Sequence, residues 1–371
     1  MSKRKLLCPC LFGLESILAG EIKRLGGEDI QVTDGKVTFF GDDAMLARAN
    51  LNLRTAERVL VVLGQFVANT FEELFQGMRA LPLEQFIGGK DRFPVKGWSL
   101  NSKLASVPDC QSILKKAAVE RLKEAYGISW FEETGSLFQI QFSILKNEVT
   151  IMLDTSGVGL HKRGYRPAAN EAPIKETLAA GILDLARVKQ DTVLYDPFCG
   201  SGTFLIEGAL KALNIAPGIN RRFAAEKWAV VPEAVWKQER ERCFDLIRKD
   251  AQFTAYGGDL SPEAVALSEQ NAKRAGVSGR LRLKQADVHD FSSEGKEGVL
   301  VCNPPYGERM LDLKQAEELY AVMGRQFRSS GLNYYIITPH DGFERIFGRP
   351  ATKRRKLYNG MIRCQLYMYF R

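Results

Sequence analysis

The stretch Thr192-Val193-Leu194-Tyr195-Asp196-Pro197-Phe198-Cys199-Gly200-Ser201-Gly202-Thr203 decides the fold. Residues 192–195 are a β-type apolar run, and residues 204–210 repeat apolar side chains at helical spacing. A strand, a glycine turn and a helix open a nucleotide-binding α/β unit, because glycine lets the backbone approach a ligand closely. Leu205 stands where a dinucleotide site needs Gly or Ala, and the chain has no Gly-Lys-Ser/Thr run. The turn therefore predicts a nucleoside cofactor without a pyrophosphate.

Two further acids follow predicted strands. Asp259 ends the run 254–259, and Ser261-Pro262-Glu263 then carries the N-cap, proline and acid of a helix start. A carboxylate at the end of a second strand is the usual partner of two ribose hydroxyls. Asp287 follows the alternating run 281–286, where we expect it to meet an adenine amino group.

Asn303-Pro304-Pro305-Tyr306 follow the apolar run 299–302, a predicted short buried strand. Prolines lack a ladder N–H, so the backbone must turn at the carboxyl end of this strand. There the Asn303 side-chain oxygen and the Pro304 carbonyl can accept both hydrogens of an exocyclic amine, while Tyr306 stacks on the ring bearing it. The four residues predict a site that positions a planar amino group for attack.

Any one of these features is an ordinary turn, but four at successive strand ends in this order indicate an enzyme. NPPY alone does not distinguish target amines: it fits guanine N2, adenine N6 in nucleic acid, or a glutamine side chain in protein. A non-catalytic RNA-binding scaffold that keeps the fold is a further alternative. The intact acids Asp196, Asp259 and Asp287 beside an intact NPPY argue against it.

The motifs DPFCGSGT, GGDLS, QADVHD and NPPYGER resemble, in this order, those of class I S-adenosylmethionine-dependent methyltransferases acting on amino groups. Residues 159–167 (GLHKRGYRP) and 172–180 (APIKETLAA) resemble a narrower group. This group is the THUMP-domain RNA guanine-N2 methyltransferases, in particular the bacterial branch that modifies 23S ribosomal RNA. The resemblance covers essentially the whole chain. It implies S-adenosyl-L-methionine (SAM) as cofactor, ribosomal RNA as partner and methylation of a guanine N2 amine, with a transfer RNA guanine as an alternative target.

The resemblance also assigns site residues by motif. The catalytic residues are Asn303, Pro304, Pro305 and Tyr306. The cofactor-binding residues are Asp196, Phe198, Cys199, Gly200, Ser201, Gly202, Thr203, Asp259, Leu260, Asp287, Val288 and Asn303.

The implied fold class is α/β. A C-terminal Rossmann-like class I methyltransferase sheet with an antiparallel C-terminal hairpin follows α+β ferredoxin-like and THUMP domains. We expect the ferredoxin-like domain at residues 1–60, the RNA-binding THUMP domain at 61–160 and the methyltransferase domain at 164–371. The pattern also predicts a helix over 173–187 and a type I′ turn at Asn359-Gly360.

Composition agrees with this organisation. A chain of 371 residues suggests two or three domains, and a net charge of +8 favours a polyanionic partner. Seven cysteines without a CxxC pair, and only three histidines, argue against a zinc site and for reduced, buried thiols in a cytoplasmic protein. Glu15 interrupts the apolar run near the N-terminus, and no run reaches membrane-spanning length. We expect no metal and no membrane partner; the oligomeric state stays open.

Several basic residues are candidate RNA contacts. The insertion at residues 214–250 interleaves basic residues with tryptophans, so it can hold single-stranded RNA or pack as an amphipathic lid. A basic cluster precedes the predicted C-terminal hairpin, where it is either a phosphate contact or a solvated surface. The candidate contacts are Lys162, Arg163, Arg166, Lys353, Arg354, Arg355 and Lys356.

Overall fold

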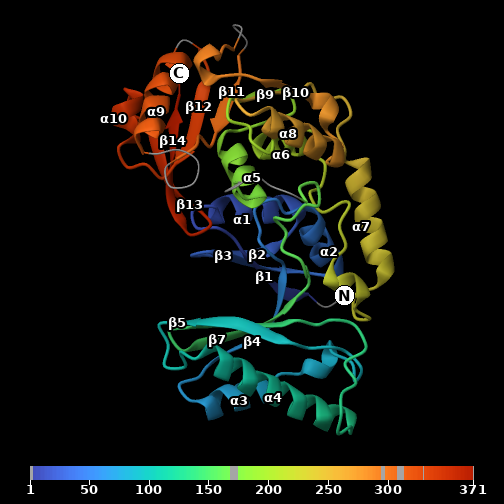
Figure 1. The fold of residues 1–371 in the computed structure, drawn as a ribbon. Coiled ribbons are helices and arrows are strands. Elements are labelled where there is room, and N and C mark those ends of the chain that lie inside the picture. The colour runs from blue at the N-terminus through green and yellow to red at the C-terminus, as the bar shows by residue number, and fades with distance from the viewer. Residues whose placement is uncertain (1–2, 168–173, 294–296, 307–312, 329, 371) are drawn as a thin grey trace.

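The computed structural model describes residues 3–167, 174–293, 297–306, 313–328 and 330–370. Two seven-stranded sheets organise the chain, one at the N-terminal side and one at the C-terminal side (Figure 1). Pro173, the expected start of a helix, and residues 307–309 of the NPPYGER motif lie outside the described residues. In the described part of the chain, none of the helices combines the length and the apolar character that crossing a bilayer requires.

The first sheet has the order β2-β3-β1-β4-β7-β6-β5. Its strands are β1 (Arg4–Pro9), β2 (Glu28–Thr33), β3 (Lys36–Gly41), β4 (Leu60–Val67), β5 (Val95–Leu100), β6 (Ile140–Leu145) and β7 (Glu148–Asp154). β1 pairs with β4 through Leu6 opposite Val61 and Leu7 opposite Leu60. The ferredoxin-like and THUMP segments therefore share one continuous sheet, which the sequence did not indicate.

Four helices and a 3-10 turn bury their apolar sides against this sheet. They are α1 (Glu15–Leu25), α2 (Asp43–Asn52), α3 (Phe71–Arg79), the turn Leu83–Gln85 and α4 (Val107–Tyr126). Local sequence sets their ends: Gly26 stops α1 in the left-handed region at φ 95°, and the Ser106 side chain caps α4 by accepting from the Asp109 N–H. The Asp34-Gly35 turn joins β2 to β3.

The second sheet has the order β10-β9-β8-β11-β12-β14-β13. The strands from β8 to β12 pair in parallel, and β14 pairs antiparallel with β12 and β13. Its strands are β8 (Val193–Asp196), β9 (Thr254–Asp259), β10 (Leu281–Gln285), β11 (Val299–Cys302), β12 (Asn333–Thr338), β13 (Lys353–Asn359) and β14 (Ile362–Tyr369). The chain reverses direction of winding between β8 and β11, and ligands of such sheets bind at the carboxyl ends of the strands there.

Helices cover both faces of this sheet. α5 (Glu176–Leu185), α6 (Thr203–Ala212) and α8 (Pro262–Arg274) contribute to one buried cluster, while α9 (Leu313–Arg328) and α10 (Phe343–Phe347) contribute to another. This arrangement confirms the expected Rossmann-like methyltransferase sheet with an antiparallel C-terminal hairpin.

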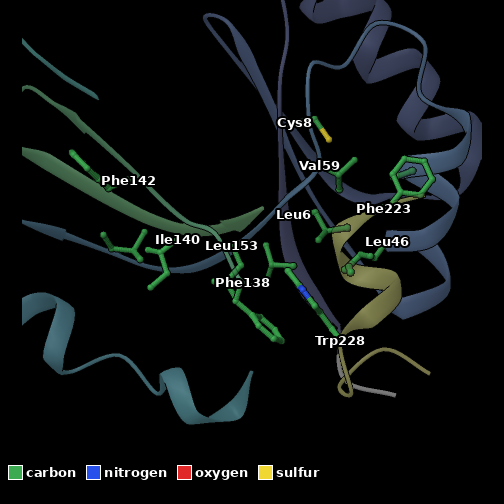
Figure 2. Close-up of a cluster of buried hydrophobic side chains, with 14 of the residues drawn as sticks. Leu6, Cys8, Leu46, Val59, Phe138, Ile140, Phe142, Leu153, Phe223 and Trp228 are labelled. Carbon is green, nitrogen blue, oxygen red and sulfur yellow. The ribbon is translucent and has the colours of Figure 1, made fainter. Parts of the chain in front are cut away.

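The insertion at 214–250 connects the C-terminal half of the chain to the N-terminal half. It contains a 3-10 turn (Ala224–Lys227) and α7 (Glu233–Asp245), which runs along α2 (Figure 1). Trp228 is 1% exposed, and its ring stacks on Phe138 with centroids 4.4 Å apart. Figure 2 shows Trp228 and Phe223 in one cluster with Leu6, Leu46 and Phe138 of the N-terminal half.

Polar contacts reinforce this junction. The Arg48 Nε of α2 donates to Glu239 Oε2 of α7 at 2.8 Å, and the Trp228 indole N–H donates to the Leu137 carbonyl. Trp236 is also buried and stacks on Phe223. The interpretation of this insertion as a stacking surface for RNA is therefore wrong for its two tryptophans, because neither ring is accessible.

The C-terminal hairpin forms, but its turn differs from the prediction. Asn359 pairs with Ile362 at the end of the ladder, so Gly360 and Met361 form the turn instead of Asn359-Gly360. A type I′ turn needs positive φ at both central residues. Gly360 has φ 65°, whereas Met361 is not in the left-handed region. The basic cluster 353–356 lies within β13 and not before it.

Candidate active site

A cavity of about 760 Å³ opens at the carboxyl ends of β8, β9, β10 and β11. This volume lies within the range typical of cofactor and substrate sites. The sequence-predicted residues that line it are Asp196, Phe198, Cys199, Gly200, Ser201, Thr203, Asp259, Leu260, Asp287, Val288, Asn303, Pro304, Pro305 and Tyr306. The structure thus brings the predicted cofactor and catalytic motifs together, with Gly202 the one member outside the lining.

The glycine turn after β8 is held by backbone geometry. Gly200 and Gly202 have φ values of 52° and 80°, which side-chain-bearing residues rarely adopt. The Gly200 N–H donates to Asp259 Oδ2 at 2.8 Å, and the Cys199 N–H donates to the Gly258 carbonyl at 2.9 Å. A Cβ on Gly202 would lie 3.0 Å from Ser268 Oγ. Gly202 therefore packs against Ser268 at the N-terminus of α6 and does not line the cavity.

Asp196 is the buried acid of the site. Its side chain lines the cavity while the residue is only 2% exposed, and Oδ1 accepts the Phe198 N–H at 3.1 Å. Burial raises the pKa of Asp196 to about 8, and the nearby Asp259 carboxylate acts in the same direction. A cation in the cavity would favour its ionised form.

Asp287 follows β10, the strand at one edge of the sheet. Its Oδ1 accepts the His289 backbone N–H at 2.9 Å and lies 2.6 Å from His289 Nδ1. These two hydrogen bonds, the backbone one first, lower the pKa of Asp287. Asp287 is therefore a carboxylate at neutral pH and can accept from an amino group.

The NPPY turn is fixed by residues outside the motif. Pro304 is buried, whereas Asn303 and Tyr306 are partly exposed to the cavity. The Tyr320 hydroxyl of α9 lies 3.4 Å from the Pro305 carbonyl, to which it donates, and 3.0 Å from Thr338 Oγ1 of β12. The Asn359 side-chain amide donates to the Tyr306 hydroxyl at 3.5 Å. Helix α9, strand β12 and the C-terminal hairpin thus hold the turn.

One wall of the cavity is formed by a helix that carries no motif in the sequence. Helix α9 contributes Gln315, Glu318, Leu319 and Val322. These side chains belong to no motif, and helical periodicity reveals a buried stripe without revealing that it faces a ligand. The further lining residues Pro197, Ser261, Ala286 and His289 belong to the quoted motifs, and Phe204 directly follows one of them. Ile174 lies in the segment 172–180, which carries part of the resemblance and was also predicted to be helical.

Two predicted RNA contacts require correction. Arg163 is 6% exposed, and its guanidinium lies against Glu207 at 3.3 Å and donates to the carbonyls of Leu160 and Arg54. The Arg166 side chain is also largely buried and donates to Thr203 Oγ1 at 2.8 Å, with Glu176 3.0 Å away. Neither guanidinium is free for a phosphate, because each is already satisfied inside the protein. Arg166 instead supports the start of α6 beside the glycine turn.

The other predicted RNA contacts are more accessible. Lys162, Lys353 and Lys356 are exposed, and Arg355 is half-buried. Arg354 is exposed but pairs with Glu344. All five remain candidate RNA contacts. Arg354 is the least available to a phosphate, because Glu344 already pairs with it.

The cavity fits the cofactor that the motifs imply. Asp196, Asp259 and Asp287 supply carboxylates, and Ile174, Phe198, Leu260 and Val288 supply apolar walls. Carboxylates suit ribose hydroxyls, an amino group and a cationic centre, while apolar walls suit an adenine ring. Burial raises the pKa of the Cys199 thiol well above neutrality, so this residue is not a thiolate nucleophile. Among the described residues, no three His, Cys, Asp or Glu side chains cluster as a metal site.

The fold and the site define a class I SAM-dependent methyltransferase. Residues 163–368 match the model of the RMKL-like methyltransferase domain, and residues 5–60 and 68–154 match the RlmL ferredoxin-like domain and the THUMP domain. The chain therefore belongs to the RMKL-like family of SAM-dependent RNA methyltransferases, and SAM is its cofactor.

Similar proteins cover the chain from end to end. The "Putative RNA methyltransferase YpsC" of Bacillus subtilis is 43% identical over an alignment of 373 positions, which covers 100% of this chain and 97% of the relative. The crystal structure of SMU.472 complexed with SAH is 41% identical, with a TM-score of 0.94, and covers 100% of this chain and 98% of that one. The demethylated cofactor thus binds a near relative of the same architecture.

Other relatives carry different target names. The "Ribosomal RNA large subunit methyltransferase K/L" of Shewanella frigidimarina is 30% identical over 370 residues, covering 96% of this chain. The match covers only 51% of that relative, so this chain corresponds to about half of its length. A structure from Listeria monocytogenes, described as a "predicted N6-adenine-specific DNA methylase", is 46% identical, with a TM-score of 0.94 and coverage of 100% and 97%.

Proposed function

We propose that this enzyme transfers the methyl group of SAM to the exocyclic N2 amine of a guanine in 23S ribosomal RNA. The observation that carries the proposal is the NPPY turn at the cavity wall, with the Asn303 side chain and the Pro304 carbonyl at the carboxyl end of β11. The THUMP match and the large-subunit ribosomal RNA name of the K/L relatives support the choice of RNA.

The chemistry requires little from the protein beyond position. SAM, when bound, supplies an activated methyl group. The guanine amino lone pair is delocalised into the ring, so the protein must make it available. Asn303 Oδ1 and the Pro304 carbonyl accept the two N–H bonds and direct the lone pair, while the Tyr306 ring stacks on the base. Tyr320 maintains this geometry through its hydrogen bond to the Pro305 carbonyl.

Adenine N6 methylation is the competing proposal. The NPPY turn accepts either amine, and the Listeria relative carries an adenine name. The THUMP domain favours RNA over DNA, which makes N6-adenine methylation of DNA the weaker proposal. A transfer RNA guanine would use the same turn and the same chemistry.

One experiment separates these targets. The full chain is incubated with isotope-labelled SAM and, separately, with unmodified 23S ribosomal RNA, transfer RNA and DNA, and the digested nucleosides are analysed by mass spectrometry. We expect labelled N2-methylguanosine from 23S ribosomal RNA, formed about 10²–10³-fold more slowly by Asn303→Ala. Labelled N6-methyladenosine as the sole product would overturn the guanine assignment and leave the fold untouched.

A further inference from the structure

The tip of the C-terminal hairpin lies between the catalytic turn and the N-terminal half. Asn359 at the end of β13 donates to the Tyr306 hydroxyl. On the other side, a Cβ on Gly13 would lie 2.8 Å from the Lys356 carbonyl, and Leu357 shares a buried cluster with Leu14. Figure 1 shows the red hairpin reaching from the catalytic sheet to α1. The hairpin tip is thus fixed at the edge of the catalytic turn.

Apolar side chains are left open at this position. Phe12, in the loop between β1 and α1, is 55% exposed, and its ring packs edge-on against Tyr358 with centroids 6.2 Å apart. Met361, at the hairpin turn, is 98% exposed. We call Phe12, Tyr358 and Met361 the hairpin patch. A single exposed apolar residue is ordinary, but here both Phe12 and Met361 are exposed. Tyr358 is half-buried and next in sequence to Asn359, which contacts Tyr306.

Basic groups flank the hairpin patch. Lys356 Nζ lies over the Tyr358 ring, 5.4 Å from its centroid, and Arg363 is directly opposite Tyr358 in the ladder. Both are exposed, and neither forms an ion pair with the part of the chain that the structure describes. The Glu15 carboxylate at the start of α1 accepts the N–H groups of Gly13 and Gly35, while Asp34 is an exposed acid of the β2–β3 turn.

We propose that the hairpin patch binds the nucleotide that adjoins the target guanosine, with the base stacked on the Phe12 and Tyr358 rings and the phosphate near Lys356 and Arg363. This inference rests on the proposed RNA substrate. A base must leave its stack to reach the NPPY turn, so the neighbouring base loses a stacking partner. Exposed aromatic rings beside cations are the usual surface for an unstacked base and its phosphate.

The proposal is tested by Phe12→Ala and Tyr358→Ala in the full chain. Loss of one base-stacking partner should raise the KM for 23S ribosomal RNA, and the Kd for the same RNA in the presence of SAH, by about 5- to 150-fold. The Kd for SAM and the thermal unfolding midpoint should stay at wild-type values. Lys356→Ala should reduce the slope of log Kd against log salt by about one. Phe244→Ala is the matched control, because Phe244 is 52% exposed on the distant helix α7.

The outcomes separate the hairpin patch from the proposed function. If RNA affinity is unchanged in Phe12→Ala and Tyr358→Ala, as in Phe244→Ala, the hairpin patch does not bind the adjoining nucleotide. An equal loss of SAM affinity or thermal stability would also overturn this proposal, because the side chains would then be structural. If the wild-type protein binds RNA but methylates no RNA nucleoside, the proposed function fails. Weaker RNA binding by the two variants would then still support the hairpin patch.

Discussion

The carboxylate of Asp259 accepts the Gly200 N–H at 2.8 Å, so the end of β9 holds the glycine turn that follows β8. The other carboxylate oxygen accepts the Ser261 N–H at 3.1 Å, at the start of α8. Each oxygen keeps a free lone pair that can accept a ribose hydroxyl. Asp259 is therefore placed both to shape the turn and to bind the cofactor.

Asp259→Ala should weaken SAM binding by about 1–3 kcal/mol, since a charged acceptor is lost. Asp259→Asn keeps an oxygen for the Gly200 N–H and should lose less. Calorimetry on folded variants measures both, with Glu269→Ala, exposed on the following helix α8, as the control. Wild-type affinity in Asp259→Ala would remove this residue from the cofactor site.

Asn303→Ala should lower the methylation rate by about 10²–10³, or roughly 3–4 kcal/mol of barrier, by analogy with the loss of one oxyanion-hole donor. SAM binding should be largely retained, because the carboxylates of Asp196, Asp259 and Asp287 remain. Single-turnover kinetics with saturating RNA isolates the transfer step. A near-wild-type rate would refute the amine-positioning mechanism.

Tyr306 tests the stacking part of the same mechanism. Tyr306→Phe keeps the ring but loses the hydroxyl that Asn359 contacts, so we expect a small effect. Tyr306→Ala should cost about 1–3 kcal/mol of base stacking. Equal losses in the two variants would show that the hydroxyl, and not the ring, is required.

Asp196 should make SAM binding depend on pH. Its pKa of about 8 in the folded protein means that a cationic ligand must displace a proton below this pH. The Kd for SAM should therefore fall as pH rises from 6 to 9, and should respond much less in Asp196→Asn. Calorimetry in buffers of different ionisation enthalpy would detect the released proton. A pH-independent Kd in the wild type would contradict this role.

The same group affects stability with a defined sign. Between its ordinary pKa of about 3.9 and its folded value of about 8, Asp196 keeps a proton that the unfolded chain has lost. Its contribution to the free energy of unfolding therefore decreases as pH rises through this window and is constant above it. Asp196→Asn should remove this part of the pH dependence in denaturant titrations.

Trp228→Ala should destabilise the protein by about 3–5 kcal/mol, because it empties a fully buried site between the two halves. Trp130→Ala is the matched control: Trp130 is 81% exposed, and its loss should change stability by less than about 0.5 kcal/mol. Denaturant unfolding measures both. A chain that begins at residue 164 would expose this aromatic layer, and we expect it to aggregate.

Arg163→Ala should destabilise the protein by about 3–5 kcal/mol, because it removes the ion-pair partner of the buried Glu207 carboxylate. RNA affinity measured on the remaining folded protein should keep its dependence on salt. Lys162→Ala alters an exposed neighbour and should leave stability unchanged within about 0.5 kcal/mol. Wild-type stability with weaker RNA binding in Arg163→Ala would restore Arg163 as an RNA contact.

The local elements of the site were well predicted from sequence. The run 299–302 matches β11, and the Ser261 cap with Pro262 marks the start of α8, because turn residues and capping groups act over a few neighbours. The same kind of turn and capping residues predict the strand ends that carry Asp196 and Asp259. Parallel pairing then places them at one edge of the sheet.

The predictions that were wrong concern contacts between residues far apart in sequence. The burial of Arg163 requires Glu207, and the burial of Trp228 requires Phe138. A basic or aromatic residue carries no local mark of whether its partner is solvent, RNA or another part of the chain. The turn at Gly360-Met361 instead reflects the ladder register, which the pairing of Leu357 with Cys364 in the core settles.

The pairing of β1 with β4 has a consequence for how a substrate is chosen. A flexible linker would let an RNA-binding module swing, but here the two N-terminal modules are parts of one hydrogen-bonded sheet, and α7 clamps that sheet to the catalytic half. The distance between the THUMP side and the cavity would then be fixed for any RNA that binds to both. We expect the enzyme to discriminate among RNAs by the distance between the element that binds the THUMP side and the nucleotide that is methylated.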